Sequence, residues 1–459
     1  MSKRLLPLLV LLAGCSLAPD YRRPAAPIPG TWPDATDATP AVTDKKPVPD
    51  WRAYFVDPQL QALIVAALEH NRDMRIALAR VEEARALAGV ARADRFPTVE
   101  LAAQRAASLT PADLSATGRQ LEAQRYDTYL GVTGFELDFW GRVKNLDEAA
   151  RAGFLASDYA ARAFRLSLVA DVAGAWFSWQ ELEERAALAA ATARSRGETV
   201  GLIAKRREVG LAGDLDYLAA DGAYQSARAE AANLARQRAA AANALRLLVG
   251  AEPVLKAQAL SALATPAELP PGLPSDVLLA RPDVIAAEQK LLAANANIGA
   301  ARAAFLPRIL LTAAAGTASR ALAGLFEAGS GAWSFTPLLK LPLFDAGRSQ
   351  GNLDLAVARR DIAVAEYEKA IQQAFREVAD MLAARRYYGE QMAAFEAAAR
   401  AQDERAKRVE ARYLAGVSSQ LELLDAQREL QSAQQSALAS RRAWLASMAS
   451  LYKALAGAN

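Results

Sequence analysis

Ala91-Arg92-Ala93-Asp94-Arg95-Phe96-Pro97 returns as Ala301-Arg302-Ala303-Ala304-Phe305-Leu306-Pro307, 210 residues further along the chain. Asp138-Phe139-Trp140-Gly141-Arg142 is similarly matched by Phe344-Asp345-Ala346-Gly347-Arg348, and Gly210-Leu211 by Gly416-Val417, both at a spacing of 206. A spacing that holds over so much of the chain indicates the tandem duplication of one unit of roughly 200 residues. In each unit a helix and a proline precede two strands, a Gly-Arg pair and very long helices, so we expect a fold of two equivalent halves.

Two long runs of the chain contain no proline, residues 112–252 and residues 343–459. These runs predict very long helices. Both runs are rich in Ala, Leu, Arg, Glu and Gln, the strongest helix formers. Residues 144–208 alone would form a helix of about 100 Å at roughly 1.5 Å per residue. Two apolar stripes on different faces of that helix favour neighbours on both sides, as in the wall of a cylinder. The first stripe includes Leu155, Tyr159, Leu166, Val169, Ala173 and Trp176, and the second Leu168, Val172, Ala175, Trp179 and Leu182.

Four segments alternate like strands, at about 97–109, 125–139, 307–319 and 332–344. A two-residue period over about ten residues is typical of outer-membrane β-strands. In the second segment we expect Tyr129 and Phe135 on one face and Val132 on the other. Further expectations are that Glu136, Asp138 and Lys340 face a lumen, that Phe139, Trp140 and Trp333 belong to an aromatic girdle, and that loops 110–124 and 320–331 face outside.

Four strands cannot close a barrel, and an open sheet edge cannot face lipid because its amides would lack hydrogen-bond partners. Two chains would supply eight strands, whose interior is largely filled by side chains, and three would supply twelve, which leave a lumen. The sequence therefore predicts an oligomer, and a conducting role favours a homotrimer.

The N-terminus has the layout of a secretory signal peptide, residues 1–14. Lys3 and Arg4 precede an apolar stretch that is too short to span a bilayer. Leu12-Ala13-Gly14-Cys15 resembles the bacterial lipobox, in which the cysteine is acylated, and Ser16 is similar to residues that direct sorting to the outer membrane. Cys15 is the only cysteine, so it forms no disulfide within the chain, and a covalent lipid is expected there. The alternative is an ordinary signal peptide with an incidental cysteine.

Composition excludes several other classes. The formal net charge of +3 gives no electrostatic reason to expect nucleic acid. A mean hydropathy of +0.02, without a long apolar run, argues against helical membrane spans. The one histidine, His70, falls at the end of a short amphipathic helix, where we expect it to face solvent or to cap the helix. With one histidine and one cysteine we expect no metal site, no cofactor other than the lipid on Cys15, and no His-based triad.

Several short segments, in order along nearly the whole mature chain, are similar to those of one known family. They are Cys15-Ser16-Leu17-Ala18-Pro19-Asp20-Tyr21, Asp57-Pro58-Gln59-Leu60, Asn71-Arg72-Asp73, Phe135-Glu136-Leu137-Asp138, Gly141-Arg142, Gly272-Leu273-Pro274-Ser275-Asp276, Arg281-Pro282-Asp283, Ala294-Asn295-Ala296-Asn297-Ile298-Gly299 and Leu423-Leu424-Asp425-Ala426-Gln427. The chain thus resembles the outer-membrane efflux factors of the OprM/TolC superfamily, in their lipoprotein branch of NodT type.

The resemblance implies a mixed α and β membrane protein, lipid-anchored in the bacterial outer membrane and extending into the periplasm. A trimeric twelve-stranded β-barrel would continue into a twelve-helix periplasmic α-barrel, each chain being a tandem repeat with four strands and long helices. The implied function is not enzymatic: a passive outer-membrane conduit of a tripartite efflux system that exports drugs or other small toxic compounds. The implied partners are a periplasmic adaptor (membrane fusion) protein, an inner-membrane pump of the resistance–nodulation–division class and outer-membrane lipid.

The expected boundaries follow the same scheme. They are a signal peptide at 1–14, a proline-rich lipidated tether at 15–56, a first repeat at 57–254, a linker at 255–275 and a second repeat at 276–459.

Residues 207–214 and 412–419 are expected to be the tips of two helical hairpins. Gly210 and Gly416 can take the left-handed conformation that ends a helix. Asp214, and Ser418 or Ser419, can cap the helix that follows. The resemblance implies that the tips dock the adaptor or the pump, through Gly210, Gly213, Asp214, Gly416 and Ser418.

Glu422 and Asp425 share one helix face beside Leu421, because they are three residues apart. In a threefold assembly this face would form an acidic ring that holds cations, over an apolar ring. The resemblance implies a periplasmic gate at Leu421, Glu422 and Asp425, with Asp216 and Tyr413 similar to residues whose bonds keep the gate shut. Ser418 stands where a family member places an arginine, so we expect a looser lock. The alternative is that these acids only complement the helix dipole.

Other classes stay open at this point. Within the channel class, heavy-metal export and type I protein secretion compete with drug efflux. A lipid-tethered coiled-coil scaffold does not explain the alternating segments, and a periplasmic hydrolase with paired carboxylates does not explain the repeat.

Overall fold

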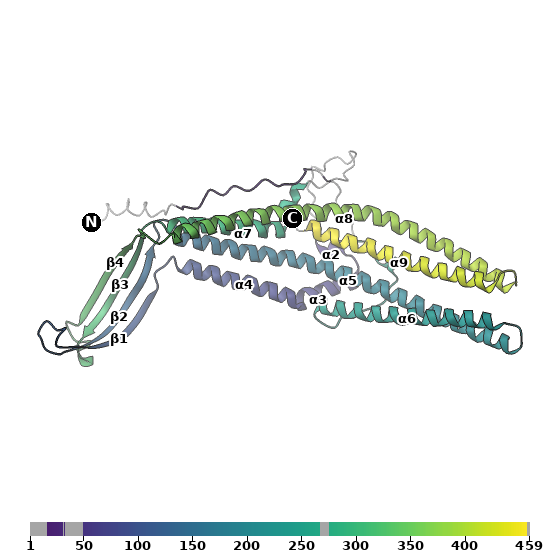
Figure 1. Ribbon diagram of the computed structural model, residues 1–459, viewed down its shortest axis with the longest axis horizontal. Coiled ribbons are helices and arrows are strands. Elements are labelled where there is room, and N and C mark those ends of the chain that lie inside the picture. Colours follow the sequence, from purple (N-terminus) through teal and green to yellow (C-terminus); the bar gives the residue numbers. More distant parts are fainter. Residues whose placement is uncertain (1–15, 31, 33–48, 267–274, 457–459) are drawn as a thin grey trace. The chain divides into compact units, whose positions relative to one another are not determined.

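The computed structural model describes residues 16–30, 32, 49–266 and 275–456 (Figure 1). The helices are α2 (Trp51–Tyr54), α3 (Pro58–His70), α4 (Arg72–Ala93), α5 (Arg142–Glu208), α6 (Asp214–Val249), α7 (Pro282–Ala303), α8 (Arg348–Leu414) and α9 (Gln420–Ala456). The strands are β1 (Val99–Thr110), β2 (Leu121–Leu137), β3 (Arg308–Ser319) and β4 (Gly331–Lys340). Short 3-10 helices are η1 (Leu260–Ala262), η2 (Ser275–Ala280) and η3 (Leu322–Gly324).

The duplication predicted from the sequence is confirmed element by element. The order α4, β1, β2, α5, α6 returns as α7, β3, β4, α8, α9. α4 and α7 are both 22 residues long, and β1 and β3 are both 12. α5 and α8 are both 67 residues long, so the predicted very long helices form in both halves.

Several of the described helices begin where a side chain accepts a hydrogen bond from a free amide of the first turn. Asp57 accepts from the amide of Leu60 at 2.8 Å and starts α3, and Asp138 accepts from the amide of Lys144 at 2.7 Å beside the start of α5. These bonds replace the missing intrahelical partners of the first turn. Asp138 therefore lies beyond the end of β2 and caps a helix, which differs from the lumen-facing strand position that we expected. His70 ends α3 as an exposed residue, as predicted.

The strands form one antiparallel sheet in the order β1-β2-β3-β4 (Figure 1). β2 begins four residues earlier than predicted because its first residue pairs with the last residue of β1. β4 ends at Lys340, earlier than the predicted 344, shortly before Pro342, which has no amide hydrogen to donate. The connecting loops are therefore 111–120 and 320–330. Within the chain, β1 and β4 each have one neighbour and so present open edges.

A β-bulge in β2 corrects the predicted alternation of its side chains. Val132 pairs with Ala313 and Phe135 pairs with Leu311, so Thr133 and Gly134 of β2 lie opposite the single residue Thr312 of β3, and β2 has one extra residue. Gly134, with φ of 65°, supplies the left-handed residue of the bulge. Phe135 therefore joins the face of Val132, and the prediction that it shares a face with Tyr129 is wrong.

The described residues fall into two compact units, each of which draws on both repeats. One contains residues 16–25, 80–157 and 286–367, and it holds the sheet. The other contains 26–79, 158–285 and 368–456 apart from the gaps given above, and it holds the ends of both hairpins.

In the second unit an aromatic cluster ties α2 to the end of α9. Tyr54 stacks on Tyr452 at 4.7 Å between ring centroids, and the Phe55 ring contacts Tyr452 edge-on. The Tyr54 hydroxyl donates to the carbonyl of Met448 at 2.9 Å. Burial raises the pKa of Tyr452 to about 12, so the cluster is uncharged at neutral pH.

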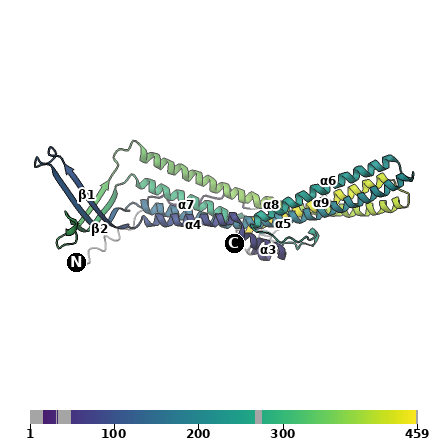
Figure 2. The ribbon, with the colours of Figure 1, turned by 90° about the horizontal axis from the view of Figure 1, so that it is seen from below.

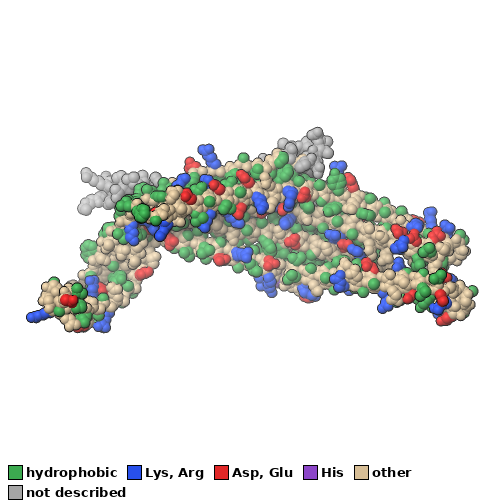
Figure 3. All heavy atoms as spheres, in the orientation of Figure 1, with side chains coloured by type: hydrophobic (Ala, Val, Ile, Leu, Met, Phe, Trp, Pro, Cys, Tyr) green, Lys and Arg blue, Asp and Glu red, His purple; other side chains and the backbone are tan. Residues whose placement is uncertain are grey.

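α5 runs beside α6, and α8 beside α9, toward the hairpin ends in both ribbon views (Figures 1 and 2). Basic and acidic side chains are interspersed with hydrophobic ones over the visible helical surface (Figure 3). In the part of the chain that the structure describes, no helix is long and apolar enough to cross a membrane.

Candidate functional site

Both hairpins turn around a glycine in the left-handed conformation. Gly210 has φ of 76° and Gly416 has φ of 72°, where other residues are strained. In the first turn the amide of Leu211 donates to the carbonyl of Arg206 at 2.7 Å, and the second turn has the equivalent bond at 2.8 Å. These bonds satisfy carbonyls at the helix ends. Both glycines therefore end their helices as predicted.

The start of α6 differs from the prediction. Asp214 is the first helical residue rather than the cap, and its carboxylate pairs with Arg207 at 2.6 Å. The cap is Gly213, whose amide donates to the carboxylate of Asp216 at 3.2 Å. A carboxylate at the third helical residue can reach back to the cap amide, so Asp216, and not Asp214, supplies the side-chain contact at the start of α6.

At the second tip the predicted cap is confirmed for one of two serines. The hydroxyl of Ser419 accepts from the amide of Glu422 at 3.2 Å and caps α9. The hydroxyl of Ser418 is buried and has no hydrogen-bond partner among the described residues.

The two acids of the predicted gate lie beside arginines of their own hairpin. Asp425 accepts from Arg405 at 3.2 Å and also from Arg428, one turn further along α9. Glu422 lies 3.9 Å from Arg412. Because these pairs are about 40% exposed at their carboxylates, solvent screens them, and each is worth little as a stabilising contact. Within one chain the helix face that carries Glu422 and Asp425 therefore contains both acidic and basic side chains, whereas the sequence alone indicated an acidic face.

Only part of this arginine set could have been found from the sequence. Arg428 is three residues after Asp425, so helical spacing places it on the same face. Arg405 and Arg412 belong to α8, and they meet these acids only because the two helices pair as a hairpin.

Asp216 and Tyr413 belong to different hairpins, and the structure does not join them. The carboxylate of Asp216 is used by the amide of Gly213. Among the described residues no hydrogen bond links Asp216 with Tyr413, so their role in closing a gate stays a prediction.

A cation that the sequence analysis missed lies on α5. Arg196 donates from Nη1 to the carbonyl of Ala223 at 3.0 Å, and its Nε is buried with no hydrogen-bond partner in the described part of the chain. Burial, and to a lesser degree the charge of Arg428, lowers the pKa of Arg196. Arg428 itself forms an ion pair with Asp425.

Large apolar side chains are exposed at both tips. Leu421, the remaining residue of the predicted gate, is 77% exposed on the first turn of α9. The others are Val209, Leu211, Leu215 and Leu218 at the first tip, and Leu414 and Val417 at the second. Clusters of exposed apolar side chains rimmed by polar ones mark contact sites for other proteins.

The base of the sheet is held by a carboxylate that touches both repeats. Glu136 accepts two bonds from Arg142 at 2.7 Å each and two from Arg308 at 2.6 and 3.2 Å. Its side chain is 11% exposed, so these charge-assisted bonds replace solvent. The indole of Trp140 donates to the carbonyl of Pro307 at 2.8 Å and adds a second link between the repeats. Arg308 pairs in register with Lys340, and Leu310, two residues further along β3, pairs with Glu136. Glu136 and Lys340 therefore lie on the same face of the sheet.

Strand register sorts the sheet side chains into an apolar face and a polar face. The apolar face contains Val99, Leu101, Leu130, Val132, Phe135, Ile309, Leu311, Ala313, Ala315, Trp333, Phe335 and Leu339. The polar face contains Glu100, Gln104, Arg125, Asp127, Tyr129, Thr312, Ser334, Thr336 and Lys340. The larger apolar side chains are more than half exposed at several positions, for example Leu101 at 74% and Trp333 at 81%. One face is therefore suited to lipid and the other to water.

Residues 16–25 are bound to the first turns of α5 and to α7. Ser16 donates to the side chain of Asn145 at 2.8 Å, and the Asn295 amide donates to the carbonyl of Pro19 at 2.8 Å. Gly299 makes this close approach possible, because a Cβ there would lie 2.7 Å from the amide nitrogen of Ala18. Cys15, the predicted lipid site, lies outside the described residues.

A buried carboxylate completes this attachment. Glu288 accepts from the hydroxyl of Tyr21 at 3.0 Å and from two nitrogens of Arg23. Burial, followed by the bond to Glu288, raises the pKa of Tyr21. The chain next to Cys15 is thus fixed to the unit that carries the sheet.

A sheet with one apolar and one polar face, joined to very long paired helices, defines a class of outer-membrane channel. The sequence model of the outer membrane efflux protein family matches residues 63–251 and 273–457. The chain belongs to this family. It is an outer-membrane efflux protein, as the resemblance of its sequence to this class indicated.

Named relatives match over almost the whole chain. The toluene efflux pump outer membrane protein TtgF of Pseudomonas putida is 45% identical over 457 residues, which cover 98% of this chain and 95% of TtgF. The outer membrane protein OprJ of Pseudomonas aeruginosa is 43% identical over 450 residues, 97% of this chain and 93% of OprJ.

Solved structures agree with the fold. A membrane protein from Pseudomonas aeruginosa has a TM-score of 0.88 at 42% identity, over 96% of this chain and 100% of that chain. The open state of the MtrE outer membrane channel of Neisseria gonorrhoeae has a TM-score of 0.85 at 36% identity, over 97% and 98%.

Proposed function

We propose that the protein is the homotrimeric exit channel of a tripartite efflux pump and passes small toxic organic compounds through the outer membrane. The observation that carries the proposal is the four-stranded sheet, which has an apolar face and two open edges. An open edge is not stable in lipid, so edges of neighbouring chains must pair. Three chains close a barrel of twelve strands around a lumen.

The cargo and partners are inferred from relatives and from the hairpin tips. The names of relatives mention toluene, solvents and antibiotics, which supports small organic compounds as the cargo. The exposed apolar side chains of both tips, together with Gly210, Gly213, Asp214, Gly416 and Ser418, supply a surface for a periplasmic adaptor or an inner-membrane pump of the resistance–nodulation–division class. A lipid on Cys15 would add an anchor next to the firmly bound residues 16–25.

The resting gate is assigned to Leu421, Glu422 and Asp425, with Asp216 and Tyr413 as candidates for the contacts that keep it closed. In a trimer three copies of Glu422 and Asp425 would surround the axis. Both oxygens of Asp425 accept from arginines and one oxygen of Glu422 lies 3.9 Å from Arg412 in each chain, so the ring would bind cations mainly through Glu422.

The test is the single-channel conductance of the purified, full-length protein in planar bilayers. We expect small openings that divalent cations reduce. The double variant Glu422→Ala/Asp425→Ala is expected to conduct more, with at least a tenfold loss of cation sensitivity, since the ring loses its charge.

Glu410→Ala, which removes an exposed carboxylate from the same hairpin, serves as the control and is expected to behave like the wild type. Unchanged conductance and cation sensitivity in an inserted double variant would move the gate to other residues. A purified trimer that never conducts would contradict the channel itself.

A further inference from the structure

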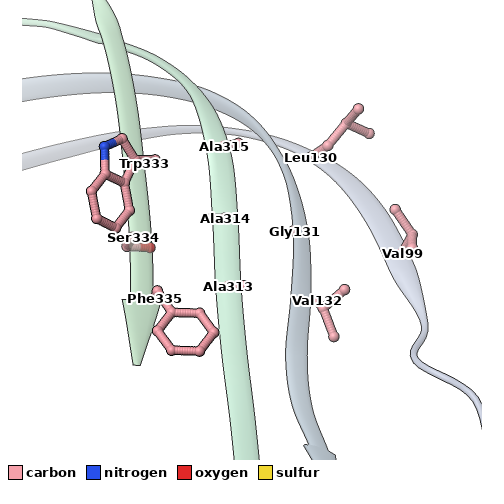
Figure 4. A pocket seen from close by; sticks show the side chains of 10 residues that line it. All are labelled: Val99, Leu130, Gly131, Val132, Ala313, Ala314, Ala315, Trp333, Ser334 and Phe335. Atoms are coloured by element: carbon pink, nitrogen blue, oxygen red, sulfur yellow. The ribbon is translucent and has the colours of Figure 1, made fainter. Parts of the chain in front are cut away.

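The apolar face of the sheet is hollowed at one place. A shallow pocket of about 590 Å³ lies over the middle of the sheet. Figure 4 shows the rings of Trp333 and Phe335 at one side of it and the aliphatic side chains of Leu130, Val132 and Val99 at the other. Ala313 and Ala315 form its floor, so only methyl groups separate the two walls. We call this hollow the acyl trough.

The apolar face ends at a row that contains a cation. Arg105 pairs in register with Tyr126, which pairs with Ser319. From Ile309 to Ser319 the strand extends about 33 Å, which is about 25 Å of membrane thickness at a usual strand tilt. The row Ala103-Thr128-Thr317 lies between the last apolar row and the Arg105 row. Arg105 therefore lies at the outer border of a sheet face about as tall as a bilayer requires. By strand rise, the Arg105 row is about 13 Å from the row that contains Leu130, Ala315 and Trp333 of the trough.

The guanidinium of Arg105 is held in place but keeps donors for a ligand. It lies 5.7 Å from the centroid of the Tyr126 ring, and its Nη2 donates to the side chain of Gln124 at 3.3 Å. The Nε and Nη1 groups have no partner among the described residues. Glu122 lies further along the strand, where its carboxylate accepts from the amide of Gln124 at 3.2 Å.

We propose that the acyl trough and Arg105 together bind one lipid A molecule of the outer leaflet, with an acyl chain in the trough and a phosphate at Arg105. This rests on the proposed function, which places loops 111–120 and 320–330 outside and so puts Arg105 at the outer surface. A planar guanidinium binds phosphate oxygens in a bidentate manner, and a ring that already orients it lowers the entropy lost on binding. The small floor and aromatic wall fit a straight saturated chain, and the spacing of trough and cation matches one lipid of a single leaflet.

The test uses Trp333 as the probe of the trough. Full-length protein is reconstituted in vesicles of phosphatidylcholine with brominated chains, which quench tryptophan on contact, and the Trp333 signal is the difference between wild type and Trp333→Phe. Added diphosphoryl lipid A is expected to displace the brominated chains and restore this signal. Arg105→Gln is expected to raise the lipid A concentration for half-restoration about tenfold, whereas Arg119→Gln, in loop 111–120, is expected to leave it unchanged.

Three results would overturn the site. They are no restoration by lipid A, equal restoration by phosphatidylglycerol, and no shift in Arg105→Gln. Conductance of the same preparation reports the proposed function separately. If the protein conducts but fails these tests, only the proposed lipid A site is contradicted. If it also does not conduct, the proposed function is contradicted as well.

Discussion

Asp345 illustrates what single residues do at the junctions between strands and helices. Its carboxylate accepts from the amide of Ser349 at 2.8 Å and from the amide of Gly347 at 3.1 Å, ahead of α8. The bonds from Ser349, foremost its hydroxyl, lower the pKa of Asp345. A carboxyl with a lowered pKa adds stability that is present above its ordinary pKa and is lost as the pH falls through the folded value.

We therefore expect Asp345→Asn to lower the unfolding temperature at pH 7 and to differ less from the wild type at about pH 3, below the ordinary pKa of an aspartate, because protonation of Asp345 removes the charge that its hydrogen bonds stabilise. Thermal unfolding in detergent at the two pH values measures this. Asp354→Asn, in the next turns of α8, is the control. An equal difference at both pH values would show that the charge of Asp345 is not what stabilises the junction.

Among the elements, the connector between the repeats is bound by helices of both. The Gln180 side chain on α5 donates to the carbonyl of Lys256 and accepts from the amide of Gln258, both at 3.0 Å. At Leu260 the amide donates to Glu184 at 3.0 Å, and the carbonyl accepts from Arg441 of α9 at 3.0 Å. One buried residue of the connector thus links the two hairpins.

Arg441→Gln is expected to reduce the free energy of unfolding by about 1–3 kcal/mol, because it leaves the carbonyls of Leu260 and Ser261 and the carboxylate of Glu396 without this donor. Denaturant unfolding measures the loss, and hydrogen exchange of residues 256–263 shows whether it is local. Arg400→Gln, an exposed arginine of α8, should change neither. Unaltered exchange in the connector would contradict the proposed link.

For the whole molecule the decisive feature is the pair of open edges, β1 and β4. We expect native mass spectrometry of the detergent-solubilised protein to give three chains, because three four-stranded sheets close the barrel. The assembly should persist in high salt, since backbone pairing is not screened as surface ion pairs are. A two-chain or single-chain species as the only folded form would contradict this closure.

The sequence predicted some residues of the candidate site and missed others. Gly210 and Gly416 were found because a helix end that needs a left-handed residue selects glycine locally. Leu421, Glu422 and Asp425 were found from helical spacing and from resemblance. Trp333 could be assigned to a strand, but nothing local brings it near Leu130.

By itself the amino-acid sequence determined the duplicated order of elements, the very long helices and the four strands, because proline positions and side-chain periods act within a few residues. Tertiary structure alone decided the face of Phe135, since a bulge at Gly134 resets the alternation beyond it. It also decided that Arg405 neutralises Asp425, 20 residues away, because those side chains meet only when α8 and α9 pair. Contacts between elements depend on register and packing, which no single stretch of the chain encodes.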